Sequence, residues 1–214
     1  MKILIAVPCM DQVPAQFAHS LATLNRVGEC FVSFQISSLI YTARDDLAKK
    51  AIELEADYVL WLDSDMVFNA DTLQRLMANI EKGDIVTGLY YRRVSPFSPV
   101  LFKKIEFDGT NCIHEEFDEI PDDVFEVEAC GFGCCLVPTN VFIDVASKFG
   151  FVFTPLGNSG EDISFCWRAR QCGYKIVCDP SIALGHVGHH IVTREFYEAF
   201  RRKDESKTVK TDKS

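Results

Sequence analysis

The chain has 214 residues, of which 48% are hydrophobic and 12% are aromatic, including 17 Phe. This composition is typical of a soluble globular protein and excludes disorder over most of the length, and the length suits one domain with a sizeable core. The 31 acidic residues exceed the 22 Lys and Arg and give a formal charge of −9, so we expect no direct affinity for nucleic acid.

The sequence contains no apolar run as long as a membrane span. The N-terminal residues, from Met1 to Val7, lead directly into strand-like sequence rather than into a cleavable signal, so we expect a cytoplasmic protein. The 9 Cys are an odd number without Cys-x-x-Cys spacing, which argues against a disulfide framework and against a common zinc site. Most of them are expected to be reduced core residues, and the oligomeric state is not indicated.

Strands and helices alternate through the first 90 residues. Apolar runs predict strands at Lys2–Val7, Cys30–Ile36, Tyr58–Leu62 and Ile85–Leu89. Apolar residues at helical spacing predict helices at Asp11–Val27, Thr42–Glu55 and Ala70–Lys82. This alternation predicts an α/β fold with a mostly parallel central sheet flanked by helices, in which ligands bind beyond the carboxyl ends of the strands. The loop from Pro8 to Asp11 is expected at that rim.

The pattern changes after residue 90 into a small β-rich elaboration. Strands are predicted at Val100–Lys103, Ile105–Phe107, Phe125–Val127 and Glu126–Val137, with an acidic loop at Glu115–Asp123. The last of these strands is interrupted at Gly131-Phe132-Gly133, which indicates a bulge, a close backbone approach or a simple turn. Helices then follow at Val141–Phe149 and from Glu161 to Gly173, with a strand at Lys175–Cys178 and a disordered tail from Arg201.

Two carboxylates follow the buried strand Tyr58–Leu62, in the sequence Asp63-Ser64-Asp65. One of them could cap the following helix, but a helix needs one cap and two acids are present. Residues i and i+2 of an extended segment point the same way, so both carboxylates can face one point beyond the sheet. Oxygen ligands in this arrangement suit a hard divalent cation. Trp61, within the strand, is expected in the core, and the environment of Trp167 is left open.

Two further motifs lie near the C-terminus. Glu161 and Asp162 follow Gly160 at the start of a predicted helix, where they could be catalytic carboxylates or could stabilise the helix dipole. His186 lies between glycines, and a neutral imidazole is a good third ligand for a divalent metal, while His189 and His190 receive no role. A Rossmann dinucleotide motif and a P-loop motif are both absent from the sequence.

In this order and spacing the motifs resemble the GT-A glycosyltransferases, particularly the family 2-like group of small nucleotide-sugar transferases, over roughly residues 2–190. The resemblance implies a GT-A, Rossmann-like fold with one catalytic domain over residues 1–192. Residues 1–90 would form the nucleotide-sugar-binding half and residues 91–192 the acceptor half, followed by a C-terminal helix and tail over 193–214. The segment Thr42-Ala43-Arg44-Asp45 resembles the Ala-Arg-Asn segment of the family, with Asp where Asn is common.

The resemblance also implies roles for individual residues. Asp63, Asp65 and His186 would hold Mn²⁺ or Mg²⁺ against the donor diphosphate, with Asp65 the strongest candidate for direct ligation. Asp162 would be the base, with Glu161 as its partner. Other residues expected near the nucleotide sugar are Pro8, Asp11, Arg44, Ser64 and Arg92, with Arg93 as a further candidate for contact with the phosphates.

The predicted function is a metal-dependent glycosyltransferase, a hexosyltransferase that moves a sugar from a nucleoside-diphosphate sugar to an acceptor hydroxyl. Inversion is favoured over retention, and the acceptor could be a glycan, a lipid carrier, a protein or a modified base. One alternative is a nucleotidyltransferase that makes sugar nucleotides, which should carry a basic, Gly-rich N-terminal loop, unlike Val7–Asp11. Another is a non-catalytic nucleotide-sugar-binding protein, which should have lost the acids or the histidine.

Overall fold

The computed structural model describes residues 1–188 and 191–201. Its strands are β1 (Lys2–Cys9), β2 (Glu29–Ile36), β3 (Tyr58–Leu62), β4 (Met66–Val67), β5 (Ile85–Leu89), β6 (Leu101–Phe107), β7 (Cys112–Glu116), β8 (Phe125–Val127), β9 (Ala129–Cys130), β10 (Cys134–Pro138), β11 (Ile176–Ala183) and β12 (Gly185–His186). Its helices are α1 (Ala15–Thr23), α2 (Ile40–Glu53), α3 (Thr72–Met77), α4 (Thr139–Phe149) and α5 (Glu161–Gln171). Residues 194–201 are also helical.

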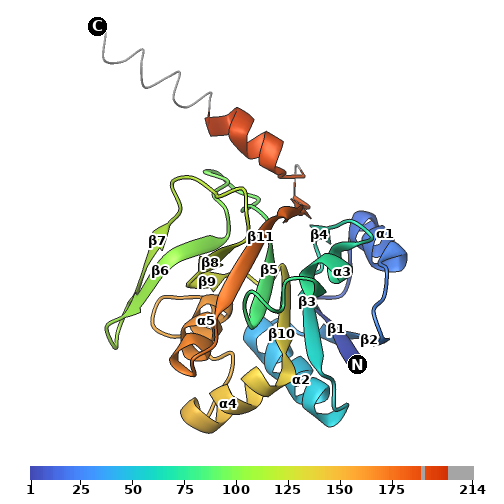
Figure 1. Cartoon of the computed structure of the whole chain (residues 1–214), viewed down its shortest axis with the longest axis vertical. Coiled ribbons are helices and arrows are strands. Elements are labelled where there is room, and N and C mark those ends of the chain that lie inside the picture. The colour runs from blue at the N-terminus through green and yellow to red at the C-terminus, as the bar shows by residue number, and fades with distance from the viewer. Residues whose placement is uncertain (189–190, 202–214) are drawn as a thin grey trace, which may run out of the picture.

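A seven-stranded central sheet has the order β2-β1-β3-β10-β5-β11-β8 (Figure 1). β1 is parallel to β2 and β3, and β5 is parallel to β11. β10 is antiparallel to both β3 and β5, and β8 is antiparallel to β11. Five strands therefore run in one direction and two in the other, which confirms the predicted α/β fold with a mostly parallel sheet. β10 can occupy a central position because its first four residues are apolar and buried.

Two of the three helices of the first half are shorter than predicted, whereas α2 has the predicted length and begins and ends two residues earlier. α1 begins only after Pro14, whose ψ of 145° is extended, and it ends before Leu24, which is also extended. α3 ends at Met77 rather than at Lys82. In the second half, the two short strands predicted before Asp108 are a single strand, β6. It pairs with β7, which includes the first residues of the predicted acidic loop, because Gly109 turns the chain with a φ of 96°.

Helices cover both faces of the central sheet. The core on one face includes Leu47 of α2, Val141 of α4 and Phe165 of α5, and the core on the other includes Phe17 of α1 and Leu73 of α3. Trp61 is fully buried among aromatic rings, which confirms its predicted place in the core; the rings are Phe132, Phe142 and Phe153. Trp167 is half-buried and packs on Phe107 and Phe149. Six of the nine cysteines are buried and all are free thiols, as expected.

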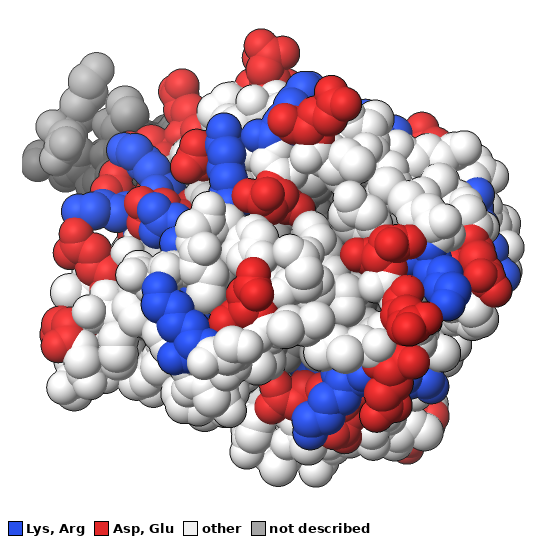
Figure 2. Space-filling model, turned by 60° about the horizontal axis from the view of Figure 1, so that its bottom comes forward, with Lys and Arg blue, Asp and Glu red and all other residues white. Residues whose placement is uncertain are grey.

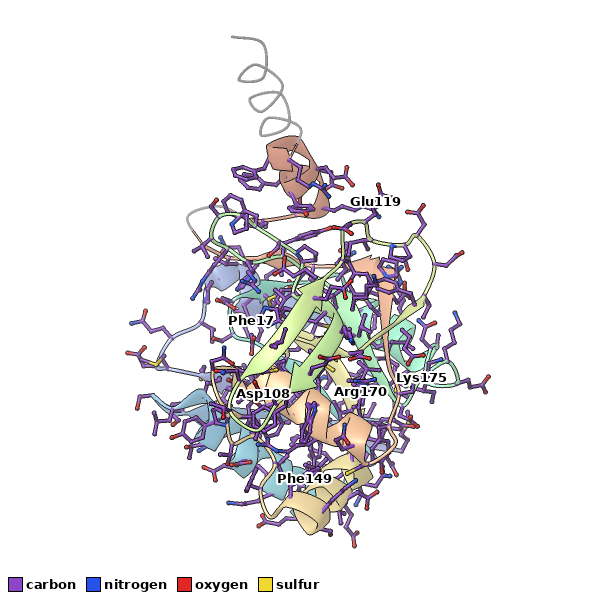
Figure 3. The ribbon with its side chains drawn as sticks, turned by 90° about the vertical axis from the view of Figure 1, so that its left-hand side faces the viewer. Phe17, Asp108, Glu119, Phe149, Arg170 and Lys175 are labelled. Carbon is purple, nitrogen blue, oxygen red and sulfur yellow. The ribbon has the colours of Figure 1, made fainter. Side chains whose placement is uncertain are left out.

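The β-rich elaboration is a three-stranded sheet, β7-β6-β9, that packs against α5. Glu128 joins the two, because its carboxylate accepts the Ile105 backbone N–H at 2.7 Å and an Arg170 N–H at 2.8 Å. Figure 3 shows Arg170 on α5 below the hairpin, with Asp108 at the hairpin end. The elaboration is thus attached to the same helix that begins with Glu161 and Asp162.

The Gly131-Phe132-Gly133 segment makes a close approach to Tyr90. A Cβ at Gly131 would lie 2.0 Å from Tyr90 Oη, and a Cβ at Gly133 would lie 2.7 Å from Tyr90 Cζ. The Gly133 N–H also donates to Tyr90 Oη at 3.1 Å. Of the three interpretations left open by the sequence, the close backbone approach is the one observed. The Tyr90 ring in turn contacts His186 edge-on, with the ring centroids 5.7 Å apart.

No helix within residues 1–188 and 191–201 is long and apolar enough to cross a membrane. The face at the bottom of Figure 1 comes forward in Figure 2, where acidic and basic side chains are interspersed without an extended basic patch. That face is therefore no obvious site for a polyanion. The predicted disordered tail begins at Arg201, which still belongs to the helical segment 194–201. His189, His190 and residues 202–214 lie outside the described residues.

Candidate functional site

A cavity of about 390 Å³ lies beyond the carboxyl ends of the parallel strands β1, β2, β3 and β5. This is the rim at which open α/β sheets bind ligands. Its ionisable lining consists of Arg44, Asp63, Asp65, Arg93, Glu161, Asp162 and His186. The remaining lining residues are Pro8, Cys9, Met10, Ser37, Ser38, Ile40 and Ser64. Four carboxylates, two guanidinium groups and one imidazole, from five separate parts of the chain, therefore face one space.

Arg44 connects the two acidic motifs beneath this cavity. It projects from α2, is only 2% exposed, and donates from Nη2 to Asp63 Oδ1 at 2.7 Å and from Nε to Glu161 Oε1 at 3.0 Å. Its guanidinium also lies over the rings of Trp61 and Phe132, 5.5 Å and 5.3 Å from their centroids. Burial alone would lower the pKa of Arg44, but Asp63 and Glu161 raise it above its ordinary value. Arg44 therefore stays charged and fixes both carboxylates.

Asp65 has different partners. Its Oδ2 accepts a hydrogen bond from Arg93 Nη1 at 2.6 Å and lies 3.3 Å from His186 Nε2. The backbone produces this proximity, because β4 pairs antiparallel with β12, with His186 opposite Met66. The Val187 N–H also donates to the Asp65 carbonyl at 2.8 Å. Residues about 120 positions apart in the sequence thus meet at one carboxylate oxygen.

His186 has a defined tautomer. Its Nδ1 lies 2.9 Å from the Tyr91 carbonyl, which can only accept, so Nδ1 carries the proton. In the neutral ring Nε2 is then an unprotonated nitrogen directed at a carboxylate oxygen, and either a proton on Nε2 or a metal cation between the two atoms would relieve their repulsion. Burial would lower the pKa of His186, but its hydrogen bond to Asp65 and the charge of that carboxylate raise it. Burial would likewise raise the pKa of Asp65, but His186 and Arg93 lower it.

These two residues fit a divalent cation as part of its coordination. Adjacent ligand atoms of an ion bound at about 2.1–2.2 Å are separated by about 3 Å, close to the observed 3.3 Å between Asp65 Oδ2 and His186 Nε2. No group of three His, Cys, Asp or Glu side chains able to hold a metal occurs in the part of the chain that the structure describes. The residues present are therefore sufficient only for an ion that also takes ligands from a phosphate or from water.

Asp162 is the most perturbed carboxyl group of the cavity. Burial and the neighbouring charge of Glu161 raise its pKa from the usual 3.8 to about 7, although Arg44 opposes this rise. Its Oδ1 accepts the Ile163 N–H at 2.8 Å, in the first turn of α5. The helix dipole therefore acts on Asp162, but the group remains able to exchange a proton near neutral pH.

Only some of the other predicted residues line the cavity. Pro8 and Ser64 line it, whereas Asp11 and Arg92 are not among its lining residues. Arg92 instead donates to Glu116 of β7 at 3.3 Å. Asp45 accepts the Phe153 N–H at 3.1 Å and so holds the loop before α5. Ser37, Ser38 and Ile40 line the cavity but were not predicted, although the place of Ser37 and Ser38 directly after β2 was a usable signal.

A second cavity of about 390 Å³ lies between the loop after β7 and the helical segment 194–201. Its lining residues are Tyr91, Phe117, Asp118, Glu119, Ile120, Asp122, Arg194, Tyr197, Glu198 and Arg201. Glu119 lies beside the helical segment in Figure 3. The rings of Tyr91 and Tyr197 stack with centroids 4.7 Å apart. Because Tyr91 also supplies the carbonyl that orients His186, the C-terminal helical segment packs against the back of the first site.

No protein-family model and no curated protein matches the sequence. Solved structures do match the fold. A197 from STIV has a TM-score of 0.63 at 19% identity, covering 88% of this chain and 86% of that one. GalNAc-T7, solved with UDP, GalNAc and Mn²⁺, has a TM-score of 0.60 at 12% identity over 87% of this chain. TarS 1-349 from S. aureus, solved with UDP-GlcNAc, has a TM-score of 0.53 at 17% identity over 83%.

The chain has a GT-A-like fold. It matches 44% of the GalNAc-T7 chain and 56% of the TarS chain, so it corresponds to only part of each of those proteins. The GT-A-like fold resembles that of nucleotide-sugar glycosyltransferases, in agreement with the fold expected from the motifs. Identities of 12–19% establish the fold alone. The roles of individual residues must be argued from their own geometry.

Proposed function

We propose that this chain is a metal-dependent glycosyltransferase, which moves a sugar from a nucleoside-diphosphate sugar to an acceptor hydroxyl. The observation that carries the proposal is the single cavity that brings Asp63, Asp65, Glu161, Asp162 and His186 together at the carboxyl ends of the parallel strands. A GT-A-like fold supports it, because two of the similar structures contain UDP or a UDP-sugar. We assign residues 1–90 to the donor half and residues 91–192 to the acceptor half of one catalytic domain.

The charge of the cavity favours a metal requirement. Its carboxylates outnumber its guanidinium groups by four to two, so a diphosphate would meet net repulsion there. Asp65 and His186 would hold Mn²⁺ or Mg²⁺, with the imidazole favouring Mn²⁺, and Asp63 would lie close by. When bound, such an ion would neutralise the charge that develops on the leaving diphosphate. Arg44 offsets the charge of Asp63 and Glu161 from beneath and keeps both in place.

Asp162 is suited to the role of general base. With a pKa of about 7 it is ionised in a large fraction of molecules at neutral pH, and it still has appreciable affinity for a proton. In an inverting transfer, the Asp162 carboxylate takes the proton of the acceptor hydroxyl as that oxygen bonds to the anomeric carbon. The bond from the same carbon to the diphosphate oxygen breaks, and the diphosphate leaves with the electron pair. Glu161 accepts a hydrogen bond from Arg44 and so fixes the start of α5 beside the cavity.

The test is release of nucleoside diphosphate from a panel of nucleotide sugars in the presence of MnCl₂. The wild type should hydrolyse at least one donor slowly without an acceptor, and chelation of the metal should stop it. Asp65→Ala should lose metal-dependent nucleotide binding in calorimetry, whereas Asp162→Asn should keep binding and lose turnover. Asp71→Asn, at an exposed acid just before α3, is the control. Nucleotide binding that is indifferent to both metal and Asp65→Ala would refute the proposal.

The same experiment separates this function from a non-catalytic nucleotide-sugar-binding protein. A binding protein would bind the donor with Mn²⁺ but release no diphosphate, and Asp162→Asn would change nothing. The raised pKa of Asp162 favours the enzyme, because carboxyl groups with a strongly raised pKa cluster at catalytic sites.

A further inference from the structure

We propose that Arg93 exchanges partners on ligand binding. In this structure Arg93 supplies the cation at Asp65, and it transfers to the diphosphate when metal and nucleotide bind, so that each ligand binds well only with the other. The inference rests on the proposed function, since it concerns the same cavity.

One carboxylate oxygen, Asp65 Oδ2, has two partners. Arg93 Nη1 donates to Asp65 Oδ2 at 2.6 Å, and His186 Nε2 lies 3.3 Å from that same oxygen. His186 Nε2 and Asp65 Oδ2 are the two atoms best placed to share a divalent cation. A guanidinium on Oδ2 therefore lies on one of the two ligand atoms that the metal needs.

Arg93 and a divalent cation compete for the charge of Asp65. A divalent cation next to a guanidinium experiences like-charge repulsion, and the carboxylate that both require carries only one negative charge. Arg93 is free to leave, because its side chain is 54% exposed and contacts Asp65 from the segment after β5. A diphosphate in the same cavity would offer it oxygens for bidentate hydrogen bonds. The nucleotide thus draws Arg93, which competes with the metal, away from Asp65.

The adjacent arginine, Arg92, is not placed to exchange between Asp65 and a diphosphate. Arg92 is also part-exposed and carries the same charge, but it pairs with Glu116 on β7 and does not line the cavity. Its backbone N–H donates to the Ser98 carbonyl at 2.9 Å, and its side chain is held at Glu116, 3.3 Å away. Arg92 and Arg93 therefore form a natural pair of test and control.

The experiment measures binding rather than turnover. Calorimetry and the electron paramagnetic resonance signal of free Mn²⁺ give the affinity for MnCl₂ alone, and then with saturating UDP or GDP as the nucleotide probe. In the wild type, the nucleotide should strengthen Mn²⁺ binding by about 5–150-fold, the usual range of coupling between two ligands. Arg93→Ala should tighten the binding of Mn²⁺ alone by about tenfold and weaken the binding of nucleotide to the Mn²⁺-loaded protein by about tenfold.

The controls make the outcome decisive. Arg92→Ala removes the same charge and should alter both affinities less than about twofold, because its partner lies outside the cavity. Arg93→Lys keeps the charge and should keep the weak binding of Mn²⁺ alone. Equal effects of Arg92→Ala and Arg93→Ala, or weaker Mn²⁺ binding in Arg93→Ala, would overturn the exchange. Wild-type protein that binds neither UDP nor GDP with Mn²⁺ would instead refute the proposed function and the exchange with it.

Discussion

Replacing Asp162 by Asn should stabilise the protein above neutral pH and leave its stability nearly unchanged in acid. Burial and Glu161 raise the pKa of Asp162 from 3.8 to about 7, so the folded protein favours the protonated carboxyl group. A group with a raised pKa contributes stability that is present below the unfolded value of about 3.8 and is lost as the pH rises through about 7. Asn is neutral throughout, and its Oδ1 can still accept the Ile163 N–H.

The size of the effect follows from the pKa. Each tenfold change in a protonation equilibrium corresponds to about 1.4 kcal/mol, which sets an upper limit of about 4 kcal/mol for full ionisation of Asp162. Solvent reaches this half-buried group and reduces the penalty, so about 2 kcal/mol is expected at pH 8. In a chain of this length that free energy corresponds to an increase in Tm of about 4–8 °C.

Thermal unfolding at pH 4, 6 and 8 tests this expectation. The difference in Tm between Asp162→Asn and the wild type should be close to zero at pH 4 and should grow through pH 7. Asp71→Asn makes the same chemical change at an exposed residue just before α3, without a side-chain cap hydrogen bond to lose, and should give a small difference that does not grow. A difference for Asp162→Asn that is independent of pH, or a less stable variant at pH 8, would refute the reasoning.

Three further outcomes are expected. Because the base must be deprotonated, kcat/KM of the transfer should rise with pH and level off above about 7, as measured with the donor that the panel identifies. Arg44→Met should lower the free energy of unfolding in urea by about 3–5 kcal/mol, since two carboxylates lose a buried partner, whereas Arg170→Met should cost at most about 1 kcal/mol. Gly131→Ala should cost about 1–3 kcal/mol by collision with Tyr90 Oη, and Tyr90→Phe in that background should recover part of the loss; additive costs would contradict the contact.

Local patterns were sufficient to predict the half of the sheet that forms the rim. Each of β1, β2, β3 and β5 is a run of strand-forming residues, and alternation with helices requires their carboxyl ends to share an edge. The position of β10 could not be predicted in this way. Its place between β3 and β5 depends on pairing between residues about 50 to 75 positions apart, for example Leu136 with Val86 and with Leu60, which no local periodicity reports.

The candidate site was likewise predictable only in part. Asp63, Asp65, Glu161, Asp162 and His186 could be selected from the sequence because their motifs are short and local, and all five line one cavity. The arginines could not be sorted, because an arginine side chain is long and its partner depends on the tertiary structure. Arg92 and Arg93 are adjacent in sequence, yet one pairs with Glu116 and the other with Asp65.

Arg44 also decides which carboxylate of Asp63-Ser64-Asp65 is available to a ligand. The sequence placed Arg44 near the nucleotide, but it is buried and bonds to Asp63 Oδ1 at 2.7 Å, so the charge of Asp63 is already compensated from within the protein. Asp65 has no fully buried guanidinium partner, since Arg93 is more than half exposed and His186 compensates the charge of Asp65 only when it is protonated. A cation that enters the cavity therefore gains most at Asp65, where displacing Arg93 leaves no buried charge unpaired.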